Sequence, residues 1–287
     1  VDSVEIRNVS IDPLPQAQPV SADPRPSFHA SFDAGLSAAT PDGGLAPSIS
    51  RGTVLVPGVS GRAVRIAADG PSKNPALEYP VKGLVADHGT AMFWMRSDWD
   101  GAFTGQIPTY PMLAGYDASG AERMNVFMYF WVSFRLPRVA PLKSEEMKRE
   151  RRSDWYRGDW NHVAMVWNDG GWCKAYVNGL PYQQPFGFPG KIVADLDMKA
   201  LARLAVGSGP GAAAEFDELK IYRRPLDDGE VYDEYRAVMP VDLLVDRTVV
   251  AAGGRDEIVL SAAPGGFYVR PVPGARPPIA GRFWIGT

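Results

Sequence analysis

The middle of the chain carries two short turns of the kind that join antiparallel strands. The run WNHVAMVW (160–167) leads into the turn NDGG (168–171), and the run WCKAYV (172–177) leads into NG (178–179). Asp-Gly or Asn-Gly beside runs rich in β-branched and aromatic residues is among the strongest short-range signals for a β-hairpin. The stretch therefore predicts antiparallel strands, and an all-β fold is the first expectation for the chain.

The composition of the 287 residues fits a packed globular protein that is rich in turns. Hydrophobic residues make up 45% and aromatic residues 11%, and 30 glycines with 26 prolines suit many short strands joined by turns. A net charge of −3 predicts no general attraction to nucleic acid, and no apolar run is long enough to span a membrane. The single cysteine, Cys173, excludes an intrachain disulfide and is expected to be a small buried hydrophobe.

Further strand patterns follow in a fixed order, LAVGS (204–208) and FDELKIYRRPL (216–226). Together with WNHVAMVW and AYVNG (175–179), this series resembles the laminin-G-like, or concanavalin A-like, jelly-roll modules, in particular those of secreted bacterial proteins. The resemblance covers about residues 28–238. It implies an all-β fold, an antiparallel two-sheet jelly-roll sandwich with short helical insertions. It also implies a secreted, periplasmic or cell-surface location.

The predicted sandwich occupies residues 27–238, between two shorter segments. Residues 1–26 are rich in proline and predict an N-terminal arm with, at most, one edge strand. Residues 239–287 return to strand patterns and form either a C-terminal β extension or the start of a second β-domain. Two helices are expected within the sandwich: a charged one at 142–152, and a second one after a capping box made by Asp227 and Glu230.

Residues 125–136 have the strongest alternation in the first half of the chain and are predicted to form one strand. One parity, from Val126 to Leu136, is entirely apolar and must face the core. The other parity places Tyr129 and Trp131 together on the opposite face. Aromatic rings stack on the C–H faces of sugars, so an open face here predicts a glycan-binding platform. The alternative is that the arm or a loop covers both rings, because large exposed apolar patches are uncommon on monomers.

Aromatic residues in loops give a second set of candidate ligand-binding residues. Trp99 stands between two aspartates, and Trp155 with Tyr156 follows another. A ring beside carboxylates suits sugar stacking combined with hydrogen bonds to hydroxyl groups. Each tryptophan equally suits a plug over the end of the sandwich.

The acidic run 215–218 bears on whether the chain is a glycanase. Some concanavalin-like endoglucanases carry E-x-D-x-x-E on one strand, with the carboxylates at the distance of a retaining enzyme. Glu215 and Asp217 fit the first two places, but Lys220 stands in the third, and strict alternation points Glu218 away from Asp217. The sequence therefore assigns no catalytic residue.

The resemblance also implies a structural calcium ion as a cofactor. In laminin-G-like modules the aspartate that matches Asp217 lies near calcium, and an aspartate in the position of Asp33 often lies near it too. Calcium binds several oxygens, so an ion shared by these two residues would join both ends of the sandwich. The alternative is that Asp217 only accepts hydrogen bonds from the backbone at the start of a strand.

Three functions follow as alternatives. The first is a non-catalytic carbohydrate-binding or adhesive module, whose partner is a polysaccharide or other glycan, or another domain or protein. The second is a glycan-active hydrolase or lyase with a nonstandard site. The third is a purely structural spacer with a sealed face. Binding to polysaccharides separates the first from the third, and assays of cleavage products separate the second from both.

Overall fold

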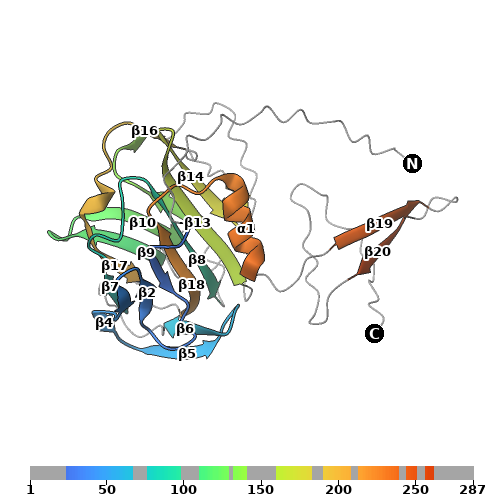
Figure 1. Cartoon of the computed structure of the whole chain (residues 1–287), viewed down its shortest axis with the longest axis horizontal. Coiled ribbons are helices and arrows are strands. Elements are labelled where there is room, and N and C mark those ends of the chain that lie inside the picture. Colours follow the sequence, from blue (N-terminus) through green and yellow to red (C-terminus); the bar gives the residue numbers. More distant parts are fainter. Residues whose placement is uncertain are drawn as a thin grey trace.

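The structure, a computed structural model, describes residues 24–66, 76–97, 110–128, 132–140, 160–182, 190–207, 213–238, 244–250 and 256–261. In this part of the chain two antiparallel sheets share one core, and the helix α1 (Asp228–Val238) lies on the outer side of the larger sheet (Figure 1). This is a concanavalin A-like jelly-roll sandwich, so the predicted fold class is confirmed. No described helix is long and apolar enough to cross a membrane.

Strand order defines the two layers. The main path of the larger sheet is β12 (Val139–Ala140), β16 (Gly190–Ile192), β14 (Trp172–Val177), β13 (Trp160–Asp169), β8 (Gly89–Ser97), β18 (Ala214–Tyr222), β1 (Phe28–Ala30), β2 (Ala38–Thr40) and β3 (Gly43–Leu45). Three strands join it at the side: β15 (Leu180–Pro181) on β14, β6 (Arg62–Ile66) on β18, and β5 (Thr53–Pro57) on β6. The smaller sheet runs β11 (Val132–Arg135), β10 (Glu122–Met128), β9 (Tyr110–Asp117), β17 (Leu201–Val206), β7 (Leu77–Pro80) and β4 (Ile49–Ser50). A short 3-10 helix, η1 (Met198–Ala200), precedes β17.

The core between the sheets follows from the alternation of side chains along each strand. Large apolar residues at every second position of β8 and β13 point inward, among them Phe93, Met95 and Trp167. Leu204 of β17 and Val126 of β10 meet them from the smaller sheet. Burial of each such side chain contributes about 1.5–3 kcal/mol, which makes this core the main stabilising element of the fold.

The predicted hairpins are present. β13 and β14 pair antiparallel, and the Asn178-Gly179 turn continues β14 into β15. Asn178 and Gly179 both adopt positive φ, 55° and 76°, as a two-residue hairpin turn requires. Cys173 on β14 is fully buried, and burial raises the pKa of its thiol to about 11. The cysteine is thus the small buried hydrophobe that the sequence predicts.

The predicted single strand over residues 125–136 is wrong, because this segment forms a hairpin. β10 and β11 pair antiparallel, with Asn125 opposite Arg135 and Val126 opposite Phe134. Val126 and Phe134 still face the core, because the two arms of a hairpin keep the same parity at paired positions. The sequence carries no Gly, Pro or Asn between the two strands, so the pattern gave no signal for a turn.

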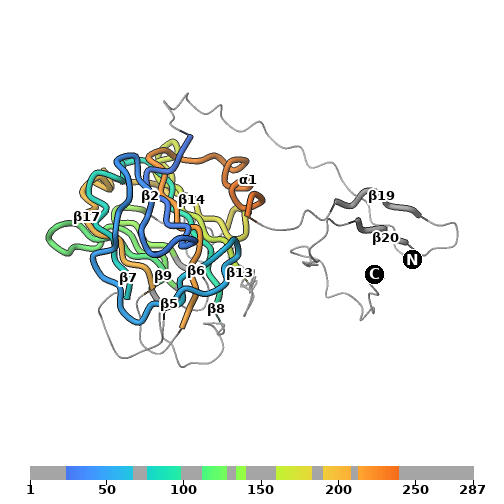
Figure 2. The backbone as a smooth tube through the Cα atoms, turned by 60° about the horizontal axis from the view of Figure 1, so that its bottom comes forward, coloured from blue at the N-terminus to red at the C-terminus, as the bar shows by residue number. Residues whose placement is uncertain are grey.

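β18 departs from strict alternation in its middle. The register with β8 shifts between Asp217 and Lys220, and Glu218 adopts a left-handed φ of 48°. Phe216 and Leu219 both enter the core, so Asp217 and Glu218 both lie on the side away from it. The prediction that Glu218 points away from Asp217 is therefore wrong. β6, which is far from β18 in the sequence, pairs with the beginning of β18. Figure 2 shows β18, in orange, running beside β6.

Two strands of the C-terminal segment match the sequence patterns. β19 (Leu244–Val250) and β20 (Asp256–Ser261) pair with each other in a two-stranded sheet of their own. The boundaries at 27–238 stay a prediction. Residues 1–23, the charged segment 142–152 and the chain after residue 261 lie outside the described residues.

Candidate functional site

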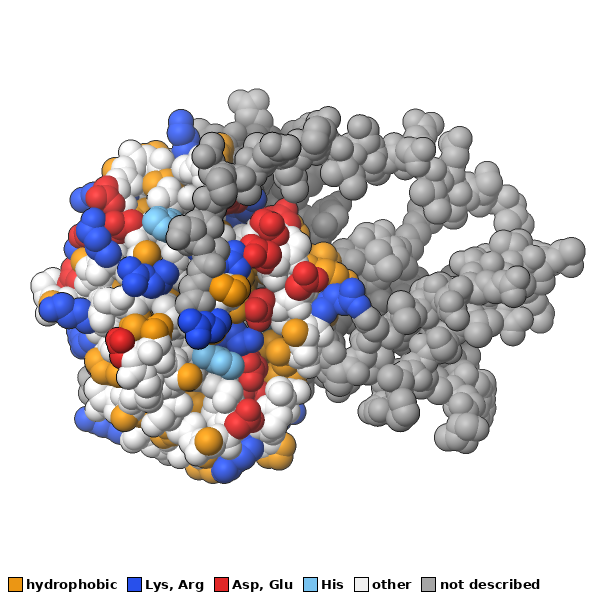
Figure 3. All heavy atoms as spheres, in the orientation of Figure 1, with side chains coloured by type: hydrophobic (Ala, Val, Ile, Leu, Met, Phe, Trp, Pro, Cys, Tyr) orange, Lys and Arg blue, Asp and Glu red, His pale blue; other side chains and the backbone are white. Residues whose placement is uncertain are grey.

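The helix α1 closes the outer face of the larger sheet. Tyr235 of α1 stacks on Trp94 of β8, with ring centroids 5.5 Å apart, and Trp94 is only 1% exposed. A second apolar cluster lies under the helix and consists of Met92, Ala164, Val166, Tyr176, Tyr222, Leu226 and Val231. Acidic side chains gather over α1 on the solvent side (Figure 3). This part of the sheet is a second core and offers no open ligand platform.

The capping box predicted for this helix is confirmed. The backbone N–H of Glu230 donates to Oδ1 of Asp227 over 2.8 Å, and the backbone N–H of Asp227 donates to Oε2 of Glu230 over 3.0 Å. Two backbone donors at the start of the helix are satisfied reciprocally.

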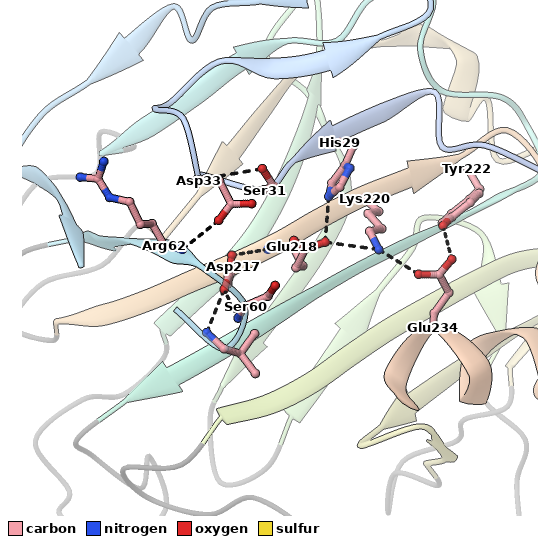
Figure 4. A network of polar contacts seen from close by, with 11 residues as sticks. His29, Ser31, Asp33, Ser60, Arg62, Asp217, Glu218, Lys220, Tyr222 and Glu234 are labelled. Carbon is pink, nitrogen blue, oxygen red and sulfur yellow. Dashed lines mark hydrogen bonds and ion pairs between the residues drawn. The ribbon is translucent and has the colours of Figure 1, made fainter. Parts of the chain in front are cut away.

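A chain of polar contacts ties α1 to β18 and β1 (Figure 4). Glu234 of α1 accepts from Lys220 Nζ over 2.9 Å and from the Tyr222 hydroxyl over 2.6 Å. Lys220 also pairs with Glu218, which contacts His29 Nε2 over 2.8 Å. Burial acts to raise the pKa of Glu218, but the hydrogen bond with His29 and the charge of Lys220 outweigh it and leave that pKa lowered. The polar groups of this network pair with one another, so the network holds α1 against the sheet. We call it the latch of α1.

Asp217 and Asp33, the predicted calcium ligands, both hold the loop between β5 and β6. Oδ2 of Asp217 accepts from the backbone N–H groups of Val59 and Ser60 over 2.9 and 3.2 Å, and its Oδ1 accepts from the N–H of Glu218. Oδ1 of Asp33 accepts from the N–H of Arg62 over 2.9 Å (Figure 4). Burial raises the pKa of Asp217 to about 7, although the three N–H donors act in the opposite direction.

These two carboxylates do not supply a calcium shell by themselves. Within the described part of the chain, no three His, Cys, Asp or Glu side chains come together in a group that could hold a metal ion. The oxygens of Asp217 face N–H dipoles, whereas calcium needs several oxygen ligands. The alternative of backbone hydrogen bonding describes the contacts seen, and calcium stays a prediction that chelation can test.

His162, the most buried of the three histidines, has a packing role. It lies between Trp94 and Tyr235, with ring centroids 5.2 and 5.9 Å away, and is 1% exposed. Burial lowers the pKa of its imidazole to about 3, so the ring is neutral at physiological pH. No described residue forms a hydrogen bond with its Nδ1.

The outer face of the smaller sheet carries a different set of side chains. Cross-strand pairs align Glu78 with Ala205, Ala205 with Ala114, Ala114 with Asn125, and Asn125 with Arg135. The neighbours of these residues along each strand belong to the core, so this row points outward. A second row brings Tyr116 between Arg203 and Glu122. We call this surface the Asn125 face; its polar and aromatic side chains are Glu78, Tyr116, Glu122, Asn125, Phe127, Arg135 and Arg203.

Asn125 is the centre of this face. Its Nδ2 donates to Oε2 of Glu122 over 2.8 Å, but none of the described residues donates to its buried Oδ1. Asn125 is 9% exposed, and a buried acceptor that lacks a donor costs about 1–3 kcal/mol. Within the described part of the chain this acceptor is one of the few buried polar atoms without a partner.

Two arginine–aromatic pairs flank Asn125. The guanidinium of Arg135 lies 5.2 Å from the ring centroid of Phe127, and that of Arg203 lies 5.6 Å from the ring of Tyr116. Burial, followed by the charge of Glu122, raises the pKa of Tyr116, so its hydroxyl keeps its proton and can donate. Carboxylate, guanidinium and aromatic groups thus lie together on this face.

The aromatic residues proposed from the sequence as ligand-binding residues, Tyr129, Trp131, Trp99, Trp155 and Tyr156, lie outside the described residues. In the sequence, Tyr129 is the residue after Met128, the last residue of β10. The sequence analysis missed Tyr116, Glu122 and Arg203. They come from three separate segments and meet only through strand pairing, for which the sequence carries no local signal.

A two-sheet antiparallel sandwich with strands in this order defines the class of concanavalin A-like domains. A family model described as the concanavalin A-like lectin/glucanases superfamily matches residues 73–232, more than half of the chain. The chain belongs to this superfamily. No curated protein matches it in sequence.

Solved structures with the same fold are distant in sequence. The ligand-binding domain of botulinum neurotoxin serotype D, in complex with N-acetylneuraminic acid, matches with a TM-score of 0.52 at 11% identity, over 74% of this chain and 50% of that one. The binding domain of Paraclostridial Mosquitocidal Protein 1 matches with a TM-score of 0.51 at 14% identity, over 77% of this chain and 54% of that one. The binding domain of botulinum neurotoxin DC, in complex with rat synaptotagmin II, matches with a TM-score of 0.54 at 11% identity, over 75% of this chain and 52% of that one. This chain spans about half the length of these structures, and at such identities the likeness shows the fold alone.

Proposed function

We propose that the chain is a non-catalytic carbohydrate-binding module of a secreted or cell-surface protein, and that the Asn125 face is its glycan site. The observation that carries the proposal is the group of accessible charged and aromatic side chains on this face, in which Arg135 contacts both the carboxylate of Glu122 and the ring of Phe127. A hydroxyl-rich ligand would meet Glu122, Arg135 and the ring of Phe127 on this face, and Asn125 would position Glu122 through its hydrogen bond.

The site combines the two ways in which proteins hold sugars. Polar side chains fix hydroxyl groups, and aromatic rings accept the C–H faces of the pyranose. Tyr129 and Trp131, which stand between β10 and β11 in the sequence, are proposed as the stacking platform of this site. Trp99, Trp155 and Tyr156 are proposed as contacts from the loops.

A polysaccharide array tests the proposal. The native chain is expected to be retained on at least one immobilised glycan. The Asn125→Ala and Trp131→Ala variants are expected to lose that retention while their melting curves stay close to that of the native chain. Asp233→Ala on the exposed side of α1 is the matched control and should bind normally.

Three results would decide against this function. Retention of no glycan by the native chain favours the structural spacer. Unchanged retention by the Asn125→Ala variant places the site elsewhere. Release of reducing ends or unsaturated products during incubation identifies the glycan-active enzyme instead.

A further inference from the structure

A row of side chains crosses the outer face of the larger sheet beside the area that α1 covers. Strand pairing sets Val54 opposite Arg65, Arg65 opposite Glu215, Glu215 opposite Arg96, and Arg96 opposite Trp160. Neighbouring residues on these strands enter the core, so the row points outward. Strands lie about 4.8 Å apart, so these five residues, the arginine row, span roughly 19 Å.

The centre of the arginine row carries an excess positive charge. Glu215 is 7% exposed and accepts from Arg65 Nη1 over 3.0 Å and from Arg96 Nε over 2.6 Å, with Arg96 Nη2 as a further contact. Two guanidinium groups thus share one carboxylate. Among the described residues, no other carboxylate pairs with either arginine.

Both arginines have donors to spare and are held in place. Each guanidinium has five N–H groups, and Arg65 contributes only one nitrogen to Glu215. Their side chains are 45% and 35% exposed, so the remaining donors can reach a ligand. Because the buried Glu215 already orders both guanidiniums, a second oxyanion would bind with little further loss of side-chain entropy.

The two ends of the row are apolar. The guanidinium of Arg96 lies 4.9 Å from the ring centroid of Trp160, which is partly exposed. At the other end Val54 is 61% exposed. A charged centre with apolar surface on both sides suits a chain of sugar rings in which a central ring carries a carboxylate.

We propose that the arginine row binds the carboxylate of a uronic-acid polysaccharide, with Arg65 and Arg96 as the groups that hold it. A guanidinium matches a carboxylate in a planar, two-point contact. The inference rests on the proposed function for the saccharide class of the ligand. Its site lies on the other sheet from Asn125, so the two sites can be tested separately.

The experiment measures retention of the full chain on uronate polymers such as polygalacturonate and alginate, each paired with its carboxyl-reduced form. The native chain is expected to bind at least one uronate polymer about tenfold more tightly than the reduced form. Arg65→Gln is expected to remove this difference and to leave binding of the reduced form unchanged. Arg65→Gln keeps the pair between Arg96 and Glu215, so the variant is expected to fold.

Two further variants sharpen the test. Arg138→Gln removes the same charge from an exposed arginine elsewhere, and it should leave the preference for uronate intact. Glu215→Gln leaves two guanidiniums without a counterion, so it is expected to bind uronate more tightly and to melt at a lower temperature. If the arginine row is only structural, Glu215→Gln lowers the melting temperature without any change in binding.

The outcomes separate the two proposals. Equal retention of a uronate polymer and its reduced form overturns the carboxylate assignment, while the proposed glycan function stands. Equal loss in the Arg65→Gln and Arg138→Gln variants, or tighter binding of sulfated polymers, reduces the effect to general charge attraction and also overturns it. Retention of no polysaccharide of any kind overturns both.

Discussion

The two sheets of the sandwich treat their outer faces in opposite ways. The larger sheet puts Met92, Trp94 and Tyr176 on its outer face and covers them with α1. The smaller sheet places Glu78, Asn125 and Arg135 on the corresponding outer face. Where the larger sheet receives its helix it has a second core, whereas the smaller sheet keeps carboxylate, amide and guanidinium groups on its outer face.

The largest expected difference between the two faces is in stability. Trp94→Ala removes a fully buried ring that stacks on Tyr235, so the free energy of unfolding is expected to fall by about 3–5 kcal/mol. Phe127→Ala on the Asn125 face is the matched control and is expected to cost about 1 kcal/mol. Urea unfolding measures both, and equal losses would mean that the two faces are not distinct.

The pH dependence of Asp217 gives the next effect. Burial raises its pKa to about 7 in the folded chain, from an ordinary 3.8. The folded state therefore holds this proton more tightly than the unfolded state. The stability that this group contributes is fully present below about pH 4 and is lost as pH rises through about 7. Urea unfolding at several pH values should show this decline, and Asp217→Asn should remove it.

If Asp217 and Asp33 bind calcium, the charged form of Asp217 is favoured and stability should not fall as pH rises. A cation favours the charged carboxylate, so chelation would lower the melting temperature of the native chain and leave the Asp217→Asn variant unaffected. A melting curve that is unchanged by chelation, together with the decline above, would exclude calcium from this loop.

The latch of α1 comes third. Glu234→Ala leaves the Tyr222 hydroxyl without its acceptor and removes one partner of Lys220, at an expected cost of about 2 kcal/mol. Asp233→Ala, one residue earlier on the same helix, is the control and should change stability by less than about 0.5 kcal/mol. Similar values for the two variants would contradict a latch role for Glu234.

The smallest effect concerns the start of the helix. Asp227→Ala removes the acceptor for the N–H of Glu230 and is expected to cost about 1 kcal/mol. Asp227→Gly exposes the backbone N–H groups at the start of the helix to water, so it is expected to cost only about a few tenths of a kcal/mol. Glycan binding by the Asn125 face should not change in either variant, since the cap belongs to the helix on the larger sheet and the Asn125 face to the smaller sheet.

Local signals predicted the parts of this fold that depend on neighbouring residues. The Asp-Gly and Asn-Gly turns, the capping box of Asp227 and the burial of Cys173 are all set within a few residues of the chain. Alternation also placed Val126 and Phe134 in the core, although the strand that carries them turns back on itself.

What the sequence could not predict depends on contacts between distant segments. The irregularity in β18 brings Asp217 to the N–H groups of Val59 and Ser60, which lie more than 150 residues away. The centre of the arginine row likewise needs three strands, β6, β18 and β8, in register before two guanidiniums meet Glu215. Pairing of this kind is decided by the whole sheet, and no short motif records it.

The Asn178-Gly179 turn also governs how closely α1 can dock. Gly179 has a φ of 76°, and a β-carbon there would come within 2.8 Å of the Tyr235 ring. The space that one missing methyl group leaves is therefore what admits the tyrosine to its place over Trp94. A single added carbon at this turn would displace the helix and expose the ring of Trp94, which would create an apolar surface prone to aggregation.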